Sequence, residues 1–296
     1  MPEPMADRIE PMMHAVAGPP VGREFAGWRL LKLIGQGANG SVYLAERPGH
    51  PSQVALKLVA LDASGGVEAA HQAFLASAAV SRGLQHAGIV RLLDAGAIGT
   101  TGWAAMEAVP GCDLTRYTSP SRLLPEPVVV RLAARVARAL SHAHRQGVVH
   151  RDLKPANVMV DWPSDTVKLT DFGLARTVDA AQTGTGVVLG SPAYMAPELL
   201  AGNVPTAQTD LYALGTMLFQ LLSGRLPHEA ATMGELLRQV ASEPAPNLRT
   251  LVPHVAPDVA DVVARLLARR SIERPADAAE VAEKLTAIAA GPGAAR

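Results

Sequence analysis

The order of hydrophobic patterns along the chain restricts its fold more than any other feature. Up to residue 109, short alternating or β-branched apolar runs predict antiparallel strands. These runs are WRLLKLIG (28–35), SVYLAER (41–47), QVALKLVA (53–60), IVRLLDAGAI (89–98) and WAAMEAV (103–109). From residue 114 onward, apolar residues recur over long stretches with helical spacing. Strands followed by helices predict an α+β fold with a small sheet-rich lobe and a larger helical lobe.

The expected helices are bounded by proline and glycine signals. One Ala-rich helix, 67–84, interrupts the strands of the small lobe, and the large lobe has expected helices at 125–147, 209–224, 234–243 and 256–270. We assign 24–109 to the small lobe and 110–288 to the large lobe, with tails at 1–23 and 289–296. The interface between two such lobes is the natural place for a ligand cleft.

Composition excludes several classes of protein. The 296 residues include 27 basic and 27 acidic side chains, so no global field favours nucleic acid or an anionic membrane. A single cysteine, Cys112, rules out an internal disulfide and a Cys-rich metal site. The richest apolar run, 211–222, is too short for a membrane span and is typical of a core helix. The N-terminus does not resemble a secretory signal, so we expect a cytoplasmic protein.

A glycine-rich segment lies between the first two long expected strands. It reads Gly35, Gln36, Gly37, Ala38, Asn39, Gly40, and is followed by Ser41 and Val42. A hairpin with three glycines lets the backbone approach phosphates and present N–H groups to them, although a plain hairpin turn explains the same pattern. The apolar run 53–60 carries one lysine, Lys57, which can bind an anion or simply lie at a sheet edge.

The strongest motif is His150-Arg151-Asp152-Leu153-Lys154-Pro155-Ala156-Asn157, followed by an apolar strand and Asp171-Phe172-Gly173. With these motifs, residues 26–288 resemble the eukaryotic-like (Hanks-type) protein kinases, and Lys154 resembles their serine/threonine branch, especially bacterial members. Further matches are Ala196-Pro197-Glu198, Asp210 at the start of an apolar helix, and Arg274, which in such kinases pairs with the glutamate of the Ala-Pro-Glu motif. The resemblance implies a bilobal protein-kinase-like fold and phosphoryl transfer from ATP to Ser/Thr hydroxyls.

The resemblance also implies a role for each polar motif residue. Asp152 would orient the acceptor hydroxyl and take its proton, while Lys154 would reach the γ-phosphate. Asn157 and Asp171 would supply oxygen ligands to Mg²⁺, or to Mn²⁺. Lys57 would neutralise the α- and β-phosphates of ATP.

The resemblance places the adenine of ATP against apolar and backbone groups. Met106 would be the gatekeeper, and the backbone of Glu107 and Val109 would form the hinge. The implied nucleotide-binding residues are Ile34, Gly35, Gln36, Gly37, Ala38, Asn39, Gly40, Val42, Ala55, Lys57, Met106, Glu107, Val109 and Met159. Ordinary core packing is the alternative for the apolar positions among them.

One part of the family pattern is missing. In the family, a glutamate on the small-lobe helix pairs with the strand lysine, and the corresponding position here is Ser77. Glu68 lies on the opposite face of the same expected helix, so it is a poor substitute. Because the nucleotide brings its own counter-charge, Lys57 could still bind phosphate, and we expect reduced but not absent activity.

The segment from Asp171 to Glu198 contains Thr177, Thr183, Thr185 and Ser191. We expect autophosphorylation at Thr183 or Thr185, in trans if the chain forms a homodimer, and docking of the new phosphate on Arg151. These threonines could instead be simple loop residues. Ser191 aligns with a threonine that contacts the catalytic aspartate in the family, and we interpret it as structural.

Two alternatives to a protein kinase remain open. A pseudokinase that binds ATP as a signalling scaffold is motivated by Ser77, but a scaffold has no physical need for Asp152, Lys154, Asn157 and Asp171 together. A small-molecule kinase of related fold is the second alternative, and the long threonine-bearing segment favours a protein substrate instead. We therefore expect ATP and Ser/Thr-containing proteins as partners, and neither nucleic acid nor membrane insertion.

Overall fold

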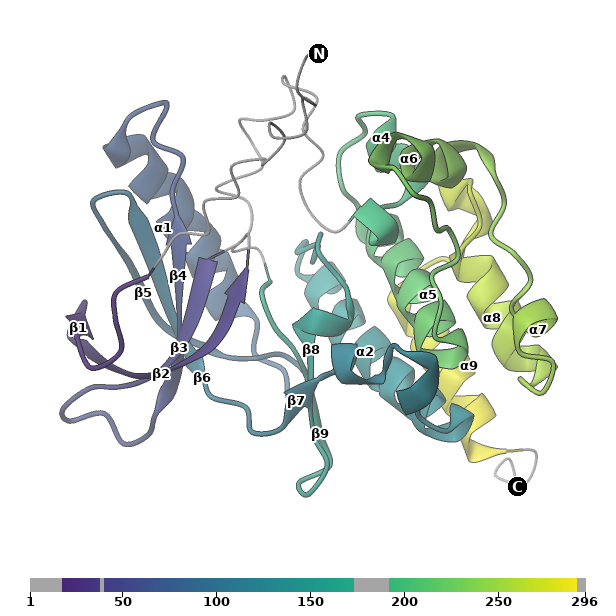
Figure 1. Ribbon diagram of the computed structural model, residues 1–296, viewed down its shortest axis with the longest axis horizontal. Coiled ribbons are helices and arrows are strands. Elements are labelled where there is room, and N and C mark those ends of the chain that lie inside the picture. Colours follow the sequence, from purple (N-terminus) through teal and green to yellow (C-terminus); the bar gives the residue numbers. More distant parts are fainter. Residues whose placement is uncertain (1–17, 38–39, 173–191, 292–296) are drawn as a thin grey trace, which may run out of the picture.

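The structure is a computed structural model that describes residues 18–37, 40–172 and 192–291. It has a sheet-rich lobe and a helical lobe, which lie side by side and are connected by a short three-stranded sheet (Figure 1). The α+β fold with two lobes expected from the order of the hydrophobic patterns is therefore confirmed.

The small lobe is built on a six-stranded antiparallel sheet in the order β1-β2-β3-β4-β6-β5. Its strands are β1 (Glu24–Phe25), β2 (Trp28–Gly37), β3 (Gly40–Glu46), β4 (Val54–Ala60), β5 (Leu92–Ile98) and β6 (Thr101–Glu107). Helix α1 (Val67–Gly83) lies against one face of this sheet (Figure 1). The helix predicted at 67–84 is confirmed to within one residue.

Alternation of side chains along the strands gives the sheet two apolar faces. On the α1 side, Val59 and Ala104 pack with Phe74 of the helix. On the other face, Trp28, Leu30 and Leu56 form a separate cluster and are fully buried. Lys57 lies two residues before Val59 on β4, so its side chain is on the same face of the sheet as helix α1. Its ammonium group therefore has apolar neighbours.

The short sheet between the lobes has the order β7-β8-β9, with β7 at Cys112–Asp113, β8 at Val158–Asp161 and β9 at Thr166–Leu169. The parallel bridge between Ile89 and Leu169 connects this sheet to the chain that leads into β5. Short 3-10 turns lie at Leu114–Tyr117, Pro120–Arg122, Pro155–Asn157, Pro192–Tyr194 and Ser271–Glu273.

The helical lobe is arranged around α5, with 13 of the 17 residues of that helix buried. Its helices are α2 (Glu126–Arg145), α4 (Pro197–Leu200), α5 (Ala207–Ser223), α6 (Met233–Ser242), α7 (Leu248–Leu251), α8 (Pro257–Leu266) and α9 (Ala278–Ala290). A capping box of Thr206 and Thr209 starts α5, and Gly224, in the left-handed conformation at φ 73°, ends it. The buried helix predicted at 209–224 is confirmed.

Helix α9 extends past the boundary expected from the sequence. The tail was expected to begin at residue 289, but the helix continues through Ala290 and ends at Gly291, with φ 72°. The reason is that Ile288 and Ala289 pack against the core of the helical lobe.

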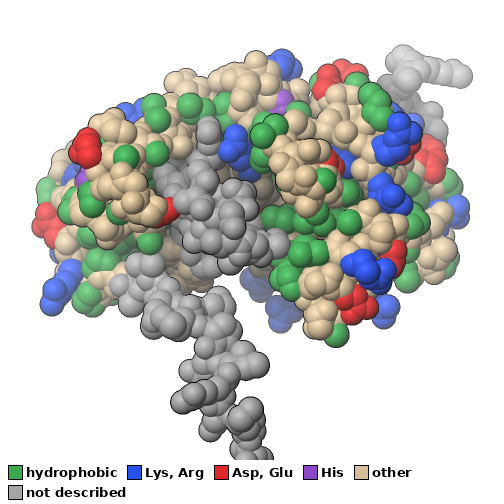
Figure 2. Space-filling view, turned by 90° about the horizontal axis from the view of Figure 1, so that it is seen from above, with side chains coloured by type: hydrophobic (Ala, Val, Ile, Leu, Met, Phe, Trp, Pro, Cys, Tyr) green, Lys and Arg blue, Asp and Glu red, His purple; other side chains and the backbone are tan. Residues whose placement is uncertain are grey.

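Among the described residues, no helix combines the length and the apolar character needed to cross a lipid bilayer. On the face shown in Figure 2, acidic and basic side chains are interspersed over both lobes.

Candidate functional site

Strand β4 carries Lys57 to the centre of the small-lobe sheet. The register places Lys57 opposite Val42 of β3 and Ala104 of β6, while Ala55 lies opposite Met106. Residues directly opposite each other on antiparallel strands share a face, as do residues two apart. Val42, Ala55, Lys57 and Met106 therefore share one face of the sheet, as the nucleotide-binding interpretation requires of them.

Lys57 makes an ion pair with Asp171 of the Asp-Phe-Gly motif. Its Nζ lies 2.8 Å from Oδ1 of Asp171, and the exposed fraction of the lysine side chain is only 8%. Burial tends to raise the pKa of the Asp171 carboxyl, but the Lys57 ammonium outweighs this and holds the pKa below its usual value. Asp171 is therefore an anion at neutral pH, and the two lobes are joined by a pair of opposite charges in which the lysine is buried and the aspartate is half-buried.

The segment 150–157 is held in place by Asp210 of α5. The backbone N–H groups of His150 and Arg151 donate to its two carboxylate oxygens at 2.8 and 2.9 Å, and His144 Nε2 lies 2.8 Å from Oδ2. Arg151 has φ 72°, a conformation that is unfavourable for a residue with a Cβ. The fully buried carboxylate of Asp210 thus stabilises a strained turn directly before Asp152.

Asp152, Lys154 and Asn157 are brought together by this turn. Lys154 Nζ lies 2.7 Å from Oδ2 of Asp152, and Asn157 Nδ2 donates to the Asp152 carbonyl at 2.6 Å and to Oδ2 at 3.1 Å. Because the amide nitrogen of Asn157 is used in this way, its oxygen is the atom that could bind a metal ion. The arrangement offers a carboxylate base, a cation beside it, and an oxygen ligand within one short turn.

The glycine-rich hairpin is formed by β2 and β3, with Gly35 opposite Val42 and Gly37 opposite Gly40. Gly40 has φ 115°, and a Cβ there would lie 1.9 Å from the carbonyl oxygen of Leu58, so the chain's own packing requires glycine. A Cβ on Gly37 would meet no heavy atom of the described residues within 4 Å. Packing therefore accounts for glycine at 40 and not at 37. Ala38 and Asn39 lie outside the described residues, and Ile34 and Gln36 are exposed.

The end of β6 is tied to the helical lobe through Glu107. Its side chain pairs with Lys168 of β9 and accepts from the backbone N–H of Arg91 at 2.9 Å. Burial alone would raise the pKa of Glu107, but the Lys168 hydrogen bond and the Arg91 contacts lower it overall. The hinge predicted at Glu107 and Val109 thus lies where the lobes meet. Met106 is buried, and Val109 and Met159 are half-buried.

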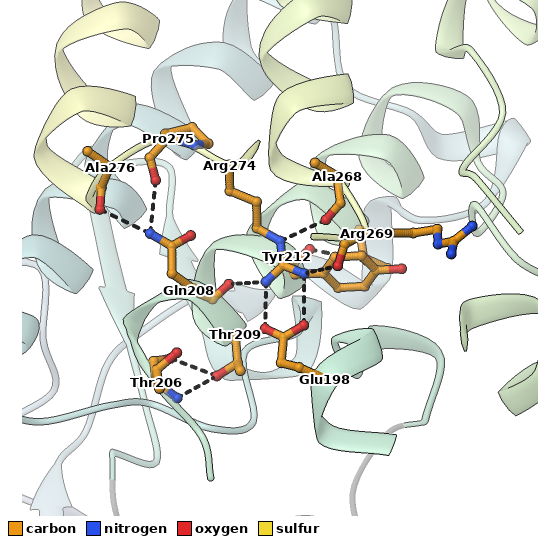
Figure 3. A network of polar contacts seen from close by, with 11 residues as sticks. Glu198, Thr206, Gln208, Thr209, Tyr212, Ala268, Arg269, Arg274, Pro275 and Ala276 are labelled. Atoms are coloured by element: carbon orange, nitrogen blue, oxygen red, sulfur yellow. Dashed lines mark hydrogen bonds and ion pairs between the residues drawn. The ribbon is translucent and has the colours of Figure 1, made fainter. Parts of the chain in front are cut away.

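Arg274 anchors the Ala-Pro-Glu motif to the helical lobe (Figure 3). Its guanidinium nitrogens lie 2.6 and 2.8 Å from the two carboxylate oxygens of Glu198 and also donate to the carbonyls of Gln208, Ala268 and Arg269. The side chain is fully buried over the ring of Tyr212, and burial raises the pKa of that phenol to about 12. The Glu198–Arg274 pair expected from the resemblance is confirmed.

Helix α1 has Ser77 at the position that the resemblance assigns to a glutamate. Ser77 is half-buried, and its carbonyl oxygen lies 3.1 Å from Ser81 Oγ. Glu68 is exposed and accepts from Gln72 on the helix surface. The expectation that Glu68 does not replace the missing glutamate agrees with this placement.

Three contacts at the candidate site were not anticipated from the sequence. They are the Lys57–Asp171 pair, the Glu107–Lys168 pair and a hydrogen bond from Ser81 to the carbonyl of Phe172. The spacing of motif residues carries no signal for them, because each joins segments far apart in the chain. Thr177, Thr183, Thr185 and Ser191, together with Gly173, lie outside the described residues.

The sequence profile described as "Protein kinase domain" matches residues 28–285. The chain belongs to the protein kinase family. It is 36% identical over 277 residues to serine/threonine-protein kinase PknJ of Mycobacterium tuberculosis, covering 91% of this chain and 46% of PknJ. It is 30% identical over 256 residues to serine/threonine-protein kinase PrkC of Bacillus subtilis, covering 86% of this chain and 39% of PrkC.

The fold agrees with this assignment to the bacterial Hanks-type serine/threonine kinases, which are ATP-dependent phosphotransferases. The crystal structure of the Mycobacterium tuberculosis PknI kinase domain superimposes with a TM-score of 0.72 at 29% identity, covering 91% of this chain and 99% of that one. The chain spans less than half the length of the curated relatives PknJ and PrkC.

Proposed function

We propose that this protein kinase domain transfers the γ-phosphate of ATP to Ser and Thr hydroxyls of proteins. The observation that carries the proposal is the turn in which Asp152 contacts both Lys154 and Asn157. This turn lies beside the segment that contains Asp171, because the Thr170 N–H donates to the Asn157 carbonyl at 2.9 Å and His150 Nε2 lies 2.9 Å from the Thr170 carbonyl. Phosphoryl transfer needs a base, cations and metal-binding oxygens in one place, and little covalent chemistry from the protein.

The nucleotide would lie against the face of the small-lobe sheet that carries Val42, Ala55 and Met106. Lys57 would bind the α- and β-phosphates, with Glu107 and Val109 at the adenine edge. Glycine at position 37, which packing does not require, is accounted for if a phosphate approaches the backbone there. Ala38, Asn39 and Met159 complete this proposed site.

Asn157 and Asp171 fit a magnesium site because both offer hard oxygen atoms, and Asp171 is kept ionised. Bound Mg²⁺ would supply charge neutralisation at the terminal phosphates. Mg²⁺ is commonly held by one or two protein groups plus substrate phosphates.

The chemical step would use Asp152 as the base. Its carboxylate would orient the acceptor hydroxyl and take its proton as the oxygen bonds to the γ-phosphorus and the bond to the ADP oxygen breaks. Lys154 would move from its contact with Asp152 to the transferring phosphate and stabilise the negative charge there.

Autophosphorylation of Thr183 or Thr185 is a further part of the proposal, in trans within a transient homodimer. Arg151 supports it, because a guanidinium binds phosphate through two parallel hydrogen bonds. Peptide mass spectrometry after incubation with ATP and Mg²⁺ tests this part. Phosphate on either threonine supports it, and the absence of phosphate from both contradicts it.

The proposed function is tested by incubating the purified chain with ATP, Mg²⁺ and an unstructured acceptor protein rich in Ser and Thr. We expect phosphoserine or phosphothreonine on the acceptor from the parent chain and about a hundred-fold less, or lower still, from Asp152→Asn. ATP binding without transfer to any acceptor would favour an ATP-binding scaffold, as Ser77 suggests. Transfer to small hydroxylated metabolites in place of the protein would favour a small-molecule kinase.

A further inference from the structure

Helix α1 reaches the Asp-Phe-Gly motif through a serine hydroxyl. Ser81 Oγ donates to the carbonyl oxygen of Phe172 at 2.5 Å, and Oγ also lies 3.1 Å from the carbonyl of Ser77 one turn earlier. Ser81 is 7% exposed, so water does not compete freely for this hydroxyl. The contact joins residues 91 positions apart and links the helix of the small lobe to the segment that contains Asp171.

The backbone at Asp171 needs such support. Asp171 has φ 66°, in the left-handed region that is unfavourable for a residue with a Cβ. A conformation of this kind persists only where the surroundings hold it in place. The Asp171 side chain is paired with Lys57, but that contact fixes the carboxylate and not the peptide groups on either side.

The two carbonyls that flank Asp171-Phe172 are both held by buried side chains. Before Asp171, the Thr170 carbonyl lies 2.9 Å from Nε2 of His150, which must donate because a carbonyl only accepts. After Asp171, the Phe172 carbonyl accepts from Ser81. The Phe172 ring packs edge-on against His150, with the ring centroids 4.5 Å apart. The helical lobe thus holds one end of the segment and α1 holds the other.

We propose that Ser81 is a positioning residue for the Asp171 carboxylate. Through the Ser81 contact, α1 controls magnesium binding, although the helix has no charged residue at Ser77. The helix is itself fixed to the small lobe by Phe74 and Ala78, which are buried against the sheet. A shift of α1 therefore moves the Phe172 carbonyl and, with it, the carboxylate one residue earlier. This inference rests on the proposed function, because it takes Asp171 as a metal ligand.

The test compares the parent with Ser81→Ala and reads the affinity for ADP by calorimetry, with and without Mg²⁺. We expect Mg²⁺ to raise the affinity of the parent for ADP, and we call the ratio of the affinities with and without Mg²⁺ the Mg²⁺ gain. This ratio should be about five-fold smaller in Ser81→Ala, in keeping with the loss of one hydrogen bond. The affinity for ADP without Mg²⁺ should stay the same, because Ser81 is not part of the proposed nucleotide site. An equal Mg²⁺ gain in both proteins would overturn the inference.

Thr216→Val is the matched control. Thr216 is fully buried in α5, and its hydroxyl donates to the carbonyl of Tyr212 one turn earlier, so it makes a buried hydrogen bond that has no contact with the Asp-Phe-Gly motif. Its removal should lower the melting temperature without changing the Mg²⁺ gain. A loss of the Mg²⁺ gain in this control as well would assign the effect to general destabilisation and contradict the proposal.

A second pair of variants covers the case in which Ser81→Ala does not fold. Ser81→Thr and Ser81→Val have nearly the same shape and differ in the hydroxyl group, so only Ser81→Thr should keep the Mg²⁺ gain. If the parent transfers no phosphate but the gain still depends on the hydroxyl, the proposed function fails and the role of Ser81 stands. If the parent transfers phosphate and Mg²⁺ dependence ignores the hydroxyl, the role of Ser81 fails alone.

Discussion

Lys57 of the small lobe and Asp171 of the helical lobe are bound to each other at 2.8 Å. The proposed function gives them different ligands, since Lys57 would bind phosphate and Asp171 would bind Mg²⁺. Binding of the nucleotide and its metal must therefore replace the contact between Lys57 and Asp171. Because each charge exchanges one partner of opposite sign for another, the exchange leaves neither group buried without a counter-charge.

The serine at position 77 makes a first prediction. A glutamate there would offer Lys57 a second carboxylate and release Asp171 for the metal. We expect Ser77→Glu to leave kcat unchanged or to raise it by up to about ten-fold, equivalent to about 1.4 kcal/mol in the barrier. Steady-state kinetics at saturating ATP measure this, with Ser77→Gln as a neutral control of the same size. A fall in kcat specific to Ser77→Glu would contradict our account of Lys57.

Two of the three hairpin glycines, Gly37 and Gly40, predict different outcomes for the same substitution to alanine. Gly40→Ala places a Cβ against the Leu58 carbonyl and should lower the melting temperature by several degrees. Gly37→Ala places a Cβ in open space and should leave the melting temperature within about 2 °C, while raising KM for ATP. Thermal unfolding and ATP titration of both variants decide the matter. An unchanged KM in Gly37→Ala would remove the support that this residue gives to the phosphate site.

The buried Arg274–Glu198 pair should matter strongly for stability. Glu198→Gln leaves the fully buried guanidinium without its counter-charge, a loss of about 3–5 kcal/mol for buried pairs. For a domain of this size, that lowers the melting temperature by roughly 10 °C. Glu273→Gln is the control, because its pair with Arg270 is exposed and should contribute under about 1 kcal/mol. Equal melting temperatures for the two variants would contradict this difference.

The Glu107–Lys168 pair should make stability depend on pH in one direction. The pKa of Glu107 is lowered in the fold from 4.5, so the stabilisation is complete above that value and is lost as the pH falls through the folded-state pKa. At pH 7, the melting temperature of Glu107→Gln should be about 2–4 °C below that of the parent, because such a pair contributes about 1 kcal/mol to the free energy of unfolding. The difference between parent and variant should shrink as the pH falls from about 5 through the folded-state pKa of Glu107. If the difference in melting temperature instead grew as the pH fell, the direction assigned to the Glu107 pKa shift would be wrong.

Local patterns predicted most of the longer elements of the fold. The apolar alternation of 53–60 predicted β4, and the Pro and Gly signals at 125–147 predicted α2, because these features depend on neighbours in the chain. Helix α9 was not predicted as an element, and its last turn was assigned to a tail, because its packing partners lie far away in the sequence.

For the candidate site, the motifs predicted which residues gather, as Asp152, Lys154 and Asn157 do. They predicted the Glu198–Arg274 pair, but they did not predict the partners of Lys57 and Ser81. Lys57 pairs with Asp171, and Ser81 donates to Phe172, because of the way the two lobes and α1 are placed against each other. Such contacts depend on tertiary geometry, and neither residue spacing nor composition encodes that in a readable form.

The most direct test of the central claim is the intact mass of the purified chain after incubation with ATP and Mg²⁺. The account predicts mass increments of one or more phosphate groups in the parent and none in Asp152→Asn, with both proteins binding ATP. Equal masses before and after incubation of the parent, or equal increments in parent and variant, would contradict the claim that Asp152 makes this chain a phosphotransferase.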